Sequence, residues 1–236
     1  MVLPLYDHSP FKWPTPPYVT WLLIIVNFII FFLQAATNDP AEVVDRVAGL
    51  IPAAFGGAVS GGLPPPLTLI TYSFLHGSFW HVFGNMIFLW VFGDDIEEAL
   101  GHWRFLAFYF GCCIGAGLVY VWSDPSSNVE LIGASGAVAG VISAYLMFRP
   151  CEKVFVLVGI LPLRLRAFWV IGGWALWQIV EVASRAQDGV AYWAHVGGLI
   201  TGAILFALIR PPGVQLFECA TAPAPGMVDR NNEWPR

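Results

Sequence analysis

Six long runs of apolar residues set the strongest constraint on how this chain can fold. A helix that crosses a bilayer needs about 20 mostly apolar residues, with roughly 17–25 tolerated. Only 11% of the 236 residues are charged, whereas a soluble domain carries about 25%. We therefore predict an all-α, polytopic membrane protein, folded as a bundle of six transmembrane helices. The predicted spans are residues 18–36, 72–93, 105–122, 131–148, 167–183 and 190–209.

The remainder of the chain divides around these spans. We expect residues 1–17 to form an N-terminal tail and 18–210 the transmembrane domain. Residues 211–236, rich in proline and alanine, are expected to be a disordered C-terminal tail. The first seventeen residues contain five prolines and no small-residue cleavage site, so no signal peptide is expected. A further apolar run, 154–163, is too short to span a bilayer, and we interpret it as an interfacial segment.

The connection between the first two predicted spans, residues 37–71, is long for a helical bundle. Asp39, followed by Pro40 and Glu42, is typical of a helix start with Asp39 as the cap. This helix is expected to stop near Gly49. The glycine-rich and proline-rich remainder predicts a partly helical loop on or in the outer leaflet.

The distribution of lysine and arginine predicts the orientation of the chain. Basic residues outside the spans are concentrated in cytoplasmic loops of membrane proteins. With the N-terminus inside, nine lie on the inner side and two, Arg46 and Arg185, on the outer side. We therefore expect cytoplasmic N- and C-termini in a bacterial plasma membrane. The inner residues are Lys12, Arg104, Arg149, Lys153, Arg164, Arg166, Arg210, Arg230 and Arg236.

Charge and cysteine content exclude several classes of function. The net charge of -5 and the scattered basic residues argue against a nucleic-acid partner, which requires a basic stripe. The four cysteines lack metal-ligand spacing, and we interpret them as packing residues or free thiols. No metal site is expected from these cysteines. The cysteines are Cys112, Cys113, Cys151 and Cys219.

Polar side chains within the spans are rare, and such residues are usually functional. His81 and Asn85 lie four residues apart, on one face of the second span. Ser135 lies near the start of the fourth span and His195 near the start of the sixth. Because these three spans run in the same direction, all four side chains are expected at a similar depth in the outer leaflet. Two other polar residues, Asn27 and Gln178, have no assigned role.

Glycines four residues apart suggest how two of these spans pack. Gly136 and Gly140 lie on the fourth span, and Gly198 and Gly202 on the sixth. Small residues at this spacing let two helices approach closely in lipid. Such packing would bring Ser135 toward His195, and a histidine within about 2.6–3.2 Å can activate a serine as a nucleophile.

These residues also allow other interpretations. A phosphate-binding loop is rejected, since the glycine-rich stretch lies inside a span and no lysine follows it. Ser135 alone would be interpreted as a helix-packing residue. The nearest acidic residues to His195, Asp188 and Glu181, lie outside the predicted site, which favours a Ser–His dyad over a triad. His81 and Asn85 can donate hydrogen bonds to an oxyanion, or they can bond the first loop to the second span.

Three motifs resemble the signatures of rhomboid intramembrane serine proteases. They are HGSFWHVFGN at 76–85, GASGAVAG at 133–140 and AHVGGLITG at 194–202. Glu97, Gly101, Arg104 and Phe105 are similar to the family's junction between the second and third spans. The resemblance extends from about residue 18 to 209. It differs at two positions: the first loop lacks a Trp-Arg pair, and Ala139 occupies a position that is aromatic in some members.

The resemblance implies a rhomboid-like bundle and assigns roles to the polar residues. Ser135 would be the nucleophile and His195 the general base, with His81 and Asn85 lining an oxyanion hole. Five glycines would pack the helices around this site: Gly133, Gly136, Gly140, Gly198 and Gly202. Apart from the resemblance, the bulky Trp174 and Trp177 on the fifth span suggest a gate beside the site, although tryptophan is also favoured near membrane interfaces. His76 is expected to be structural rather than catalytic.

The family resemblance also implies cleavage without a metal or cofactor, and it implies the class of substrates. They would be single-span membrane proteins, held in the lipid bilayer and cut near its outer face. Two alternatives remain open. One is a catalytically silent rhomboid-like protein that binds transmembrane clients, and the other is a channel or transporter.

Overall fold

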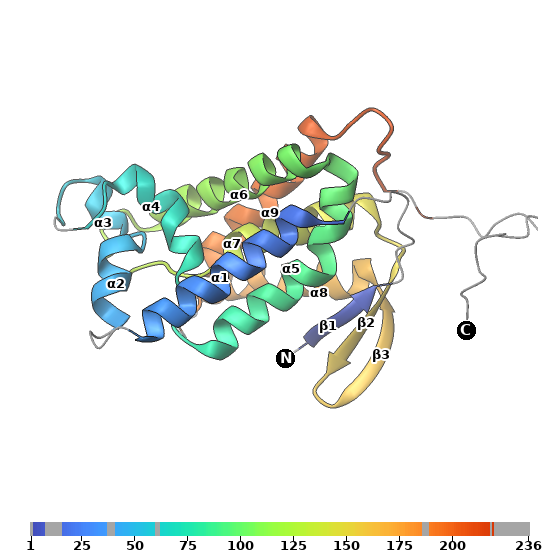
Figure 1. Cartoon of the computed structure of the whole chain (residues 1–236), viewed down its shortest axis with the longest axis horizontal. Helices are drawn as coiled ribbons and strands as arrows, with labels where there is room; N and C mark the ends of the chain where they lie inside the picture. Colours follow the sequence, from blue (N-terminus) through green and yellow to red (C-terminus); the bar gives the residue numbers. More distant parts are fainter. Residues whose placement is uncertain are drawn as a thin grey trace, which may run out of the picture.

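The computed structural model describes residues 2–7, 16–36, 41–59, 62–185, 189–217 and 219. These residues are mainly helical, with a small sheet at one end of a helical bundle (Figure 1). The helices are α1 (Tyr18–Ala36), α2 (Ala41–Ala48), α3 (Pro52–Phe55), α4 (Pro65–Thr71), α5 (Phe79–Leu100), α6 (His102–Ser123), α7 (Ser135–Phe148), α8 (Ala167–Ser184) and α9 (Tyr192–Ile209), with a 3-10 turn, η1, at Tyr72–Phe74. The strands are β1 (Val2–Asp7), β2 (Lys153–Val158) and β3 (Leu161–Arg166).

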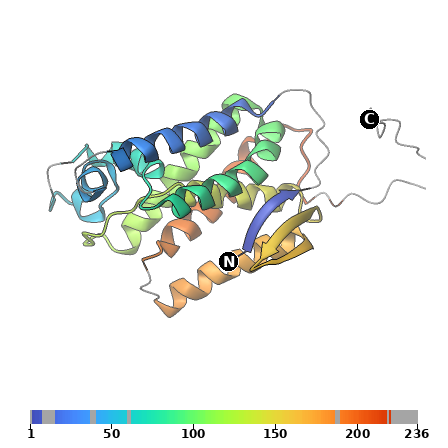
Figure 2. The same cartoon turned by 60° about the horizontal axis from the view of Figure 1, so that its bottom comes forward.

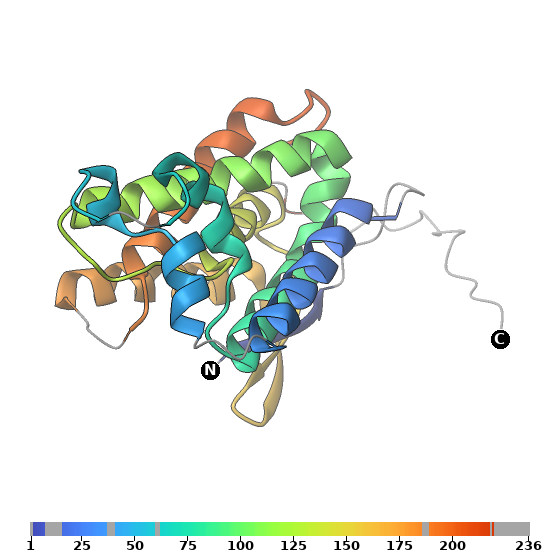
Figure 3. The same cartoon turned by 60° about the vertical axis from the view of Figure 1, so that its left-hand side comes forward.

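Helix α7 lies at the centre of the bundle and packs against α5, α6 and α9. Eleven of its 14 residues are buried. Helix α8 instead lies at the edge of the bundle, beside the sheet (Figure 2), and only Ala167, Ile171 and Gln178 of its residues are buried. The short helices α2, α3 and α4 gather at the end opposite the sheet, which Figure 3 brings forward.

Four of the described helices are long and apolar enough to cross a membrane: α1, α6, α8 and α9. Helix α7 is apolar but has only 14 residues. Helix α5 has 22 residues, but four acidic side chains lie near its C-terminal end. The described residues thus indicate an integral, multi-pass membrane protein, and the count of six spans stays a prediction.

Three predicted spans begin later in the structure than the apolar runs suggested, the sixth only slightly, since α9 begins at Tyr192 rather than at residue 190. The second was expected from residue 72, but α5 begins at Phe79, where the Ser78 side chain accepts a hydrogen bond from the His81 backbone N–H at 3.2 Å. The fourth was expected from residue 131, but α7 begins at Ser135. Gly133 has a φ of +113°, which no right-handed helix accommodates. The late start of α7 therefore places Ser135 at a helix N-terminus.

The all-α prediction is wrong in one respect, because the chain forms a three-stranded antiparallel sheet in the order β1-β2-β3. Strands β2 and β3 form a hairpin around Gly159, whose φ is +63°. This hairpin contains the run 154–163 that was interpreted as an interfacial segment. Val154 and Val156 point inward and are fully buried. The N-terminal residues 2–7 were expected in a tail, but they form β1, which pairs with β2 at the edge of the sheet.

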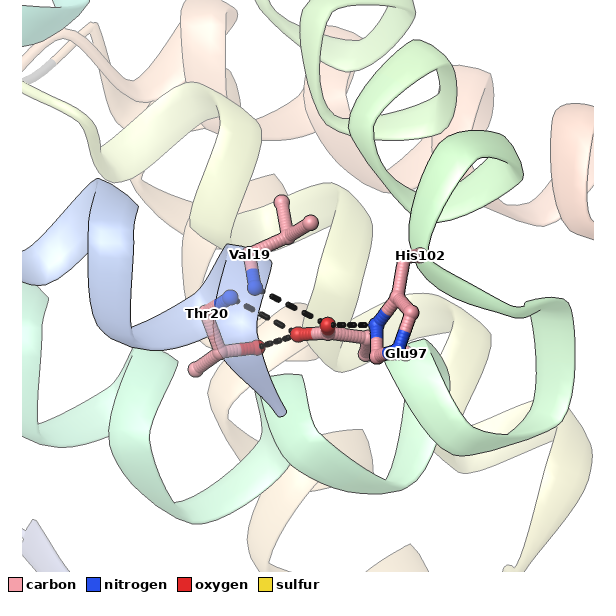
Figure 4. A network of polar contacts seen from close by, with 4 residues as sticks. All are labelled: Val19, Thr20, Glu97 and His102. Atoms are coloured by element: carbon pink, nitrogen blue, oxygen red, sulfur yellow. Dashed lines mark hydrogen bonds and ion pairs between the residues drawn. The ribbon is translucent and has the colours of Figure 1, made fainter. Parts of the chain in front are cut away.

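A buried carboxylate fastens α1 to α5 (Figure 4). Glu97 accepts hydrogen bonds from the backbone N–H groups of Val19 and Thr20 at 2.9 and 2.7 Å, and from the Thr20 hydroxyl at 2.7 Å. His102 Nδ1 lies 2.5 Å from the same carboxylate. The first N–H groups of a helix lack partners inside the helix. Glu97 supplies those partners, and its negative charge suits the helix N-terminus.

The interpretation of the four cysteines as packing residues or free thiols is correct for two of them and wrong for the other two. Cys112 and Cys113 are free and fully buried on α6, as expected for packing residues. Cys151 and Cys219 instead form a disulfide between the segment after α7 and the C-terminal segment. Their Cα atoms are 5.1 Å apart although 68 residues separate them in sequence. Only the fold brings this pair within bonding reach.

The long loop between the first two predicted spans is partly helical, as predicted, and contains α2, α3 and α4. The predicted cap residues Asp39 and Pro40 lie outside the described residues, as does most of the predicted C-terminal tail. Asp45 on α2 accepts a hydrogen bond from Gln34 Nε2 at 2.9 Å. Burial raises the pKa of the Asp45 carboxyl, and the nearby Glu130 carboxylate raises it further, whereas the bond from Gln34 opposes the shift.

Candidate active site

Ser135 and His195 lie in hydrogen-bond contact although 60 residues separate them. Ser135 is the first residue of α7, and His195 is in the first turn of α9. The Ser135 Oγ atom lies 2.8 Å from His195 Nε2. The site therefore combines a hydroxyl with a base at the distance required for proton transfer.

The close approach of α7 and α9 positions this pair. A Cβ atom built on Gly198 would overlap the carbonyl oxygen of Gly136, and one on Gly202 would overlap that of Gly140. A Cβ on Gly140 would also lie 2.8 Å from the Cys112 Cβ atom of α6. Side chains at these positions would push the helices apart. The glycine steps that were read from the sequence thus lie at the helix contact that brings Ser135 to His195.

The opposite nitrogen of the imidazole contacts Gln178, which sequence reasoning did not assign to the site. Gln178 Oε1, on α8, lies 2.7 Å from His195 Nδ1. An acidic side chain is the usual partner at this nitrogen, whereas the partner here is a neutral amide in an apolar helix. The only signal was the rarity of such an amide. Asn27, the other unassigned amide, donates to the Leu23 carbonyl within α1 and takes no part in this contact.

His81, Asn85 and Gly133 lie together beside the Ser–His pair. A Cβ atom on Gly133 would lie 2.7 Å from His81 Nε2, so only glycine fits between the α5 side chain and the turn before α7. Asn85 Nδ2 donates to His76 Nε2 at 3.0 Å, and the Ala134 N–H approaches the same nitrogen at 3.4 Å. His76 is 2% exposed. It therefore contacts both Asn85 and the turn before Ser135 from a buried position, and its structural role stays a prediction.

A cavity of about 820 Å³ opens at these residues. Its wall includes Ser135, His195, His81 and Asn85, together with Trp174 from α8. The N-terminus of a helix carries a partial positive charge and unpaired N–H groups. The start of α7 therefore presents donors at the Ser135 hydroxyl. The arrangement can accommodate a carbonyl group whose oxygen acquires negative charge.

A second cavity, of about 670 Å³, lies between α5 and α8 and reaches His195. Its walls are mostly apolar, with Phe88 and Phe92 from α5 and Trp169 from α8. Both residues of the predicted gate line it, and Trp174 also lines the first cavity. The Trp174 ring lies 5.8 Å from the His195 ring. This second cavity, called the apolar groove below, thus leads along α8 to the Ser–His pair.

Comparison with known proteins gives consistent matches. A family model described as "Rhomboid domain" matches residues 65–212. RHOMBOID-like protein 5 of Arabidopsis thaliana is 30% identical over 86% of this chain and 72% of its own length. Rhomboid protease AarA of Providencia stuartii is 24% identical over 79% of this chain and 70% of its own length. Rhomboid protein 1, mitochondrial, of Saccharomyces cerevisiae is 28% identical over 58% of this chain, which spans only 40% of the yeast protein's length.

Proposed function

The chain belongs to the rhomboid family, and from this premise we propose that it is an intramembrane serine protease. Its reaction is hydrolysis of a peptide bond in or near a transmembrane helix of a membrane protein substrate. The observation that carries the proposal is the 2.8 Å contact between Ser135 Oγ and His195 Nε2 beside a cavity of about 820 Å³. The similarity to a bacterial protein named a rhomboid protease supports the same class of reaction.

In the proposed mechanism, Ser135 is the nucleophile and His195 is the general base. His195 Nε2 takes the hydroxyl proton while Ser135 Oγ attacks the scissile carbonyl carbon. The imidazolium then donates that proton to the leaving amine, and the peptide C–N bond breaks. A water molecule, deprotonated by His195, attacks the resulting ester and releases the carboxylic acid. The proton returns to Ser135, so the enzyme is regenerated without metal or cofactor.

The carbonyl oxygen acquires negative charge in each tetrahedral intermediate. We assign its stabilisation to the backbone N–H of Ser135 at the start of α7 and to the side chains of His81 and Asn85. Asn85 can donate only part of its amide to the oxyanion, because one N–H is bonded to His76. Removing a single such donor costs about 10²–10³ in rate in a well-studied serine protease. Asn85→Ala should therefore be milder than loss of Ser135.

The substrate is proposed to approach through the apolar groove between α5 and α8. A transmembrane helix hides its own carbonyl groups in backbone hydrogen bonds, so it must unwind before its peptide bond reaches Ser135. Trp174 and Trp177 stand along this groove and would gate the passage. Single-span proteins with an easily unwound helix and a small residue at the cut are the proposed substrates.

The proposed orientation places both termini in the cytoplasm and the active site toward the outer face of a bacterial plasma membrane. The Cys151–Cys219 disulfide lies toward the end of the bundle that this orientation assigns to the cytoplasm. Disulfides are rare in that compartment. Trapping of free thiols in intact cells, followed by mass analysis of the cysteine peptides, therefore tests the orientation. Reduced cysteines in the cell support it, and a persistent disulfide argues against it.

Proteolysis in a defined membrane tests the function itself. Purified wild-type protein and Ser135→Ala would be reconstituted into vesicles with a single-span substrate whose helix contains small residues. The proposal predicts new substrate termini with the wild-type protein only. Co-purification of uncut substrate with folded wild-type protein would instead favour the client-binding alternative.

A further inference from the structure

The ring of His195 is held at both of its nitrogen atoms. Nε2 faces Ser135 Oγ at 2.8 Å, and Nδ1 faces Gln178 Oε1 at 2.7 Å. Both partners of the second contact are buried, with Gln178 3% and His195 9% exposed. Gln178, His195 and Ser135 therefore form one continuous chain of hydrogen bonds across α8, α9 and α7.

The amide of Gln178 is itself oriented by its own helix. Its Nε2 donates to the Trp174 carbonyl, one turn earlier on α8, at 3.3 Å. This bond turns Oε1 toward His195. A carbonyl oxygen can only accept a hydrogen bond, so Nδ1 must carry the proton. In the neutral ring, the lone pair then lies on Nε2, where a general base must have it to accept the Ser135 proton.

The other neighbours of the ring do not select its tautomer. Trp174 and Tyr192 lie 5.8 and 6.3 Å from the imidazole, measured between ring centroids. Aromatic contacts at these distances hold the plane of the ring but do not distinguish its two nitrogens. Residue 139, one turn after Ser135, is an alanine and supplies no ring. Among the described residues, Gln178 is the only hydrogen-bond partner of Nδ1.

We propose that Gln178 is a positioning residue, which holds His195 in the Nδ1–H tautomer and so keeps Nε2 available to Ser135. The reaction would then depend on three side chains, with a neutral amide in the position that a carboxylate occupies in a Ser-His-Asp triad. This inference rests on the proposed protease function. It makes no claim that Gln178 contacts the substrate.

Two variants with a matched control separate positioning from general packing. Gln178→Leu removes the acceptor at nearly constant size, and Gln178→Glu restores an acceptor oxygen. Asn27→Leu is the control, since Asn27 is also a buried amide that donates to the carbonyl four residues earlier. The first measurement is the rate at which a fluorophosphonate probe labels the protein. The second is the ¹⁵N spectrum of histidine-labelled protein, in which His195→Ala identifies the signals of His195.

Gln178→Leu should lower the labelling rate by about 10–100-fold, the range that follows from loss of one buried hydrogen bond. Its His195 signals should also lose the pure Nδ1–H pattern. Gln178→Glu should recover that pattern and part of the rate, and Asn27→Leu should match the wild type in both measurements. The wild-type rate and spectrum in folded Gln178→Leu would overturn the inference. If the wild type fails to label, the protease proposal fails, while the spectra still decide whether Gln178 sets the tautomer.

Discussion

Helices α9 and α8 flank the same site and have the same length of 18 residues, yet they pack in different ways. Helix α9 presses its glycines against the backbone of α7. Helix α8 carries Gly172 and Gly173, and apart from adjacent residues and the nearby backbone of α8 itself no atom lies within 4 Å of a Cβ built at either position. The fixed helix supplies His195, and the loosely packed helix supplies Gln178. The comparison indicates a site with one closely packed wall, which holds the base beside the nucleophile, and one loosely packed wall.

A matched pair of glycine substitutions tests the difference in packing between α9 and α8, and it has the largest expected effect. Gly198→Ala places a Cβ atom on the Gly136 carbonyl oxygen, so α9 must move away from α7. We expect loss of activity and a fall of about 3 kcal/mol or more in the free energy of unfolding. Gly172→Ala, the same change on α8, should alter stability by no more than about 1 kcal/mol. Equal effects in denaturation of the two variants in detergent would show that the walls do not differ.

Removing the carboxylate of Glu97 should leave α1 loosely attached to the bundle, as α8 is. Glu97→Ala leaves the first N–H groups of α1 and the Thr20 hydroxyl without their buried acceptor. We expect a loss of about 3 kcal/mol of stability and faster hydrogen exchange in α1. His102→Ala removes one contact of the same carboxylate and should have a smaller effect. Unchanged exchange in α1 would mean that packing, rather than this cap, holds the helix.

The loose packing of α8 predicts a gain of function when its groove is widened. Trp177, 57% exposed, lines the apolar groove but not the cavity that contains Ser135. Trp177→Ala should widen the groove and raise the rate of cleavage of a transmembrane substrate by a few-fold. The rate of labelling by a small probe should not change. Trp103→Ala, on α6 and 82% exposed, is the control for loss of a surface tryptophan. A fall in cleavage with Trp177→Ala would argue that this side chain binds substrate instead.

The smallest expected effect is at Asp45, on α2 in the loop between α1 and α5. Because the folded-state pKa of Asp45 is raised, its ionised form is disfavoured by folding at neutral pH. Asp45→Asn keeps an oxygen for Gln34 and removes the charge, so it should slightly stabilise the protein at neutral pH. The difference should shrink as pH falls through the raised pKa, since the wild-type carboxyl then becomes neutral in the folded state. Melting temperatures of both proteins across this pH range check the sign.

The sequence was informative wherever a repeating spacing carried the signal. Apolar runs located the long helices, and paired glycines located the contact that joins Ser135 to His195. The predicted start of α7 was wrong because residues 131–134 continue an apolar run. The positive φ of Gly133, which delays the helix, cannot be inferred from composition. The hairpin was missed because β2 is almost uniformly apolar after Lys153, which hides the alternation of a strand.

Long-range pairing was the second source of error. The Cys151–Cys219 disulfide and the Gln178–His195 bond both join residues whose spacing matches no motif. A neutral amide in an apolar helix has many packing roles, and only the arrangement of α8 and α9 brings its oxygen to Nδ1. Such contacts depend on the position of whole helices, so local sequence patterns do not encode them.

The most direct test of the account is labelling of the purified protein with a fluorophosphonate probe, followed by intact mass and peptide mapping. Wild type would be compared with Ser135→Ala and His195→Ala. The account predicts one adduct per wild-type chain, located on Ser135, and none on either variant. A folded wild-type protein that forms no adduct, or an adduct that persists in Ser135→Ala, would contradict the assignment of Ser135 as an activated nucleophile.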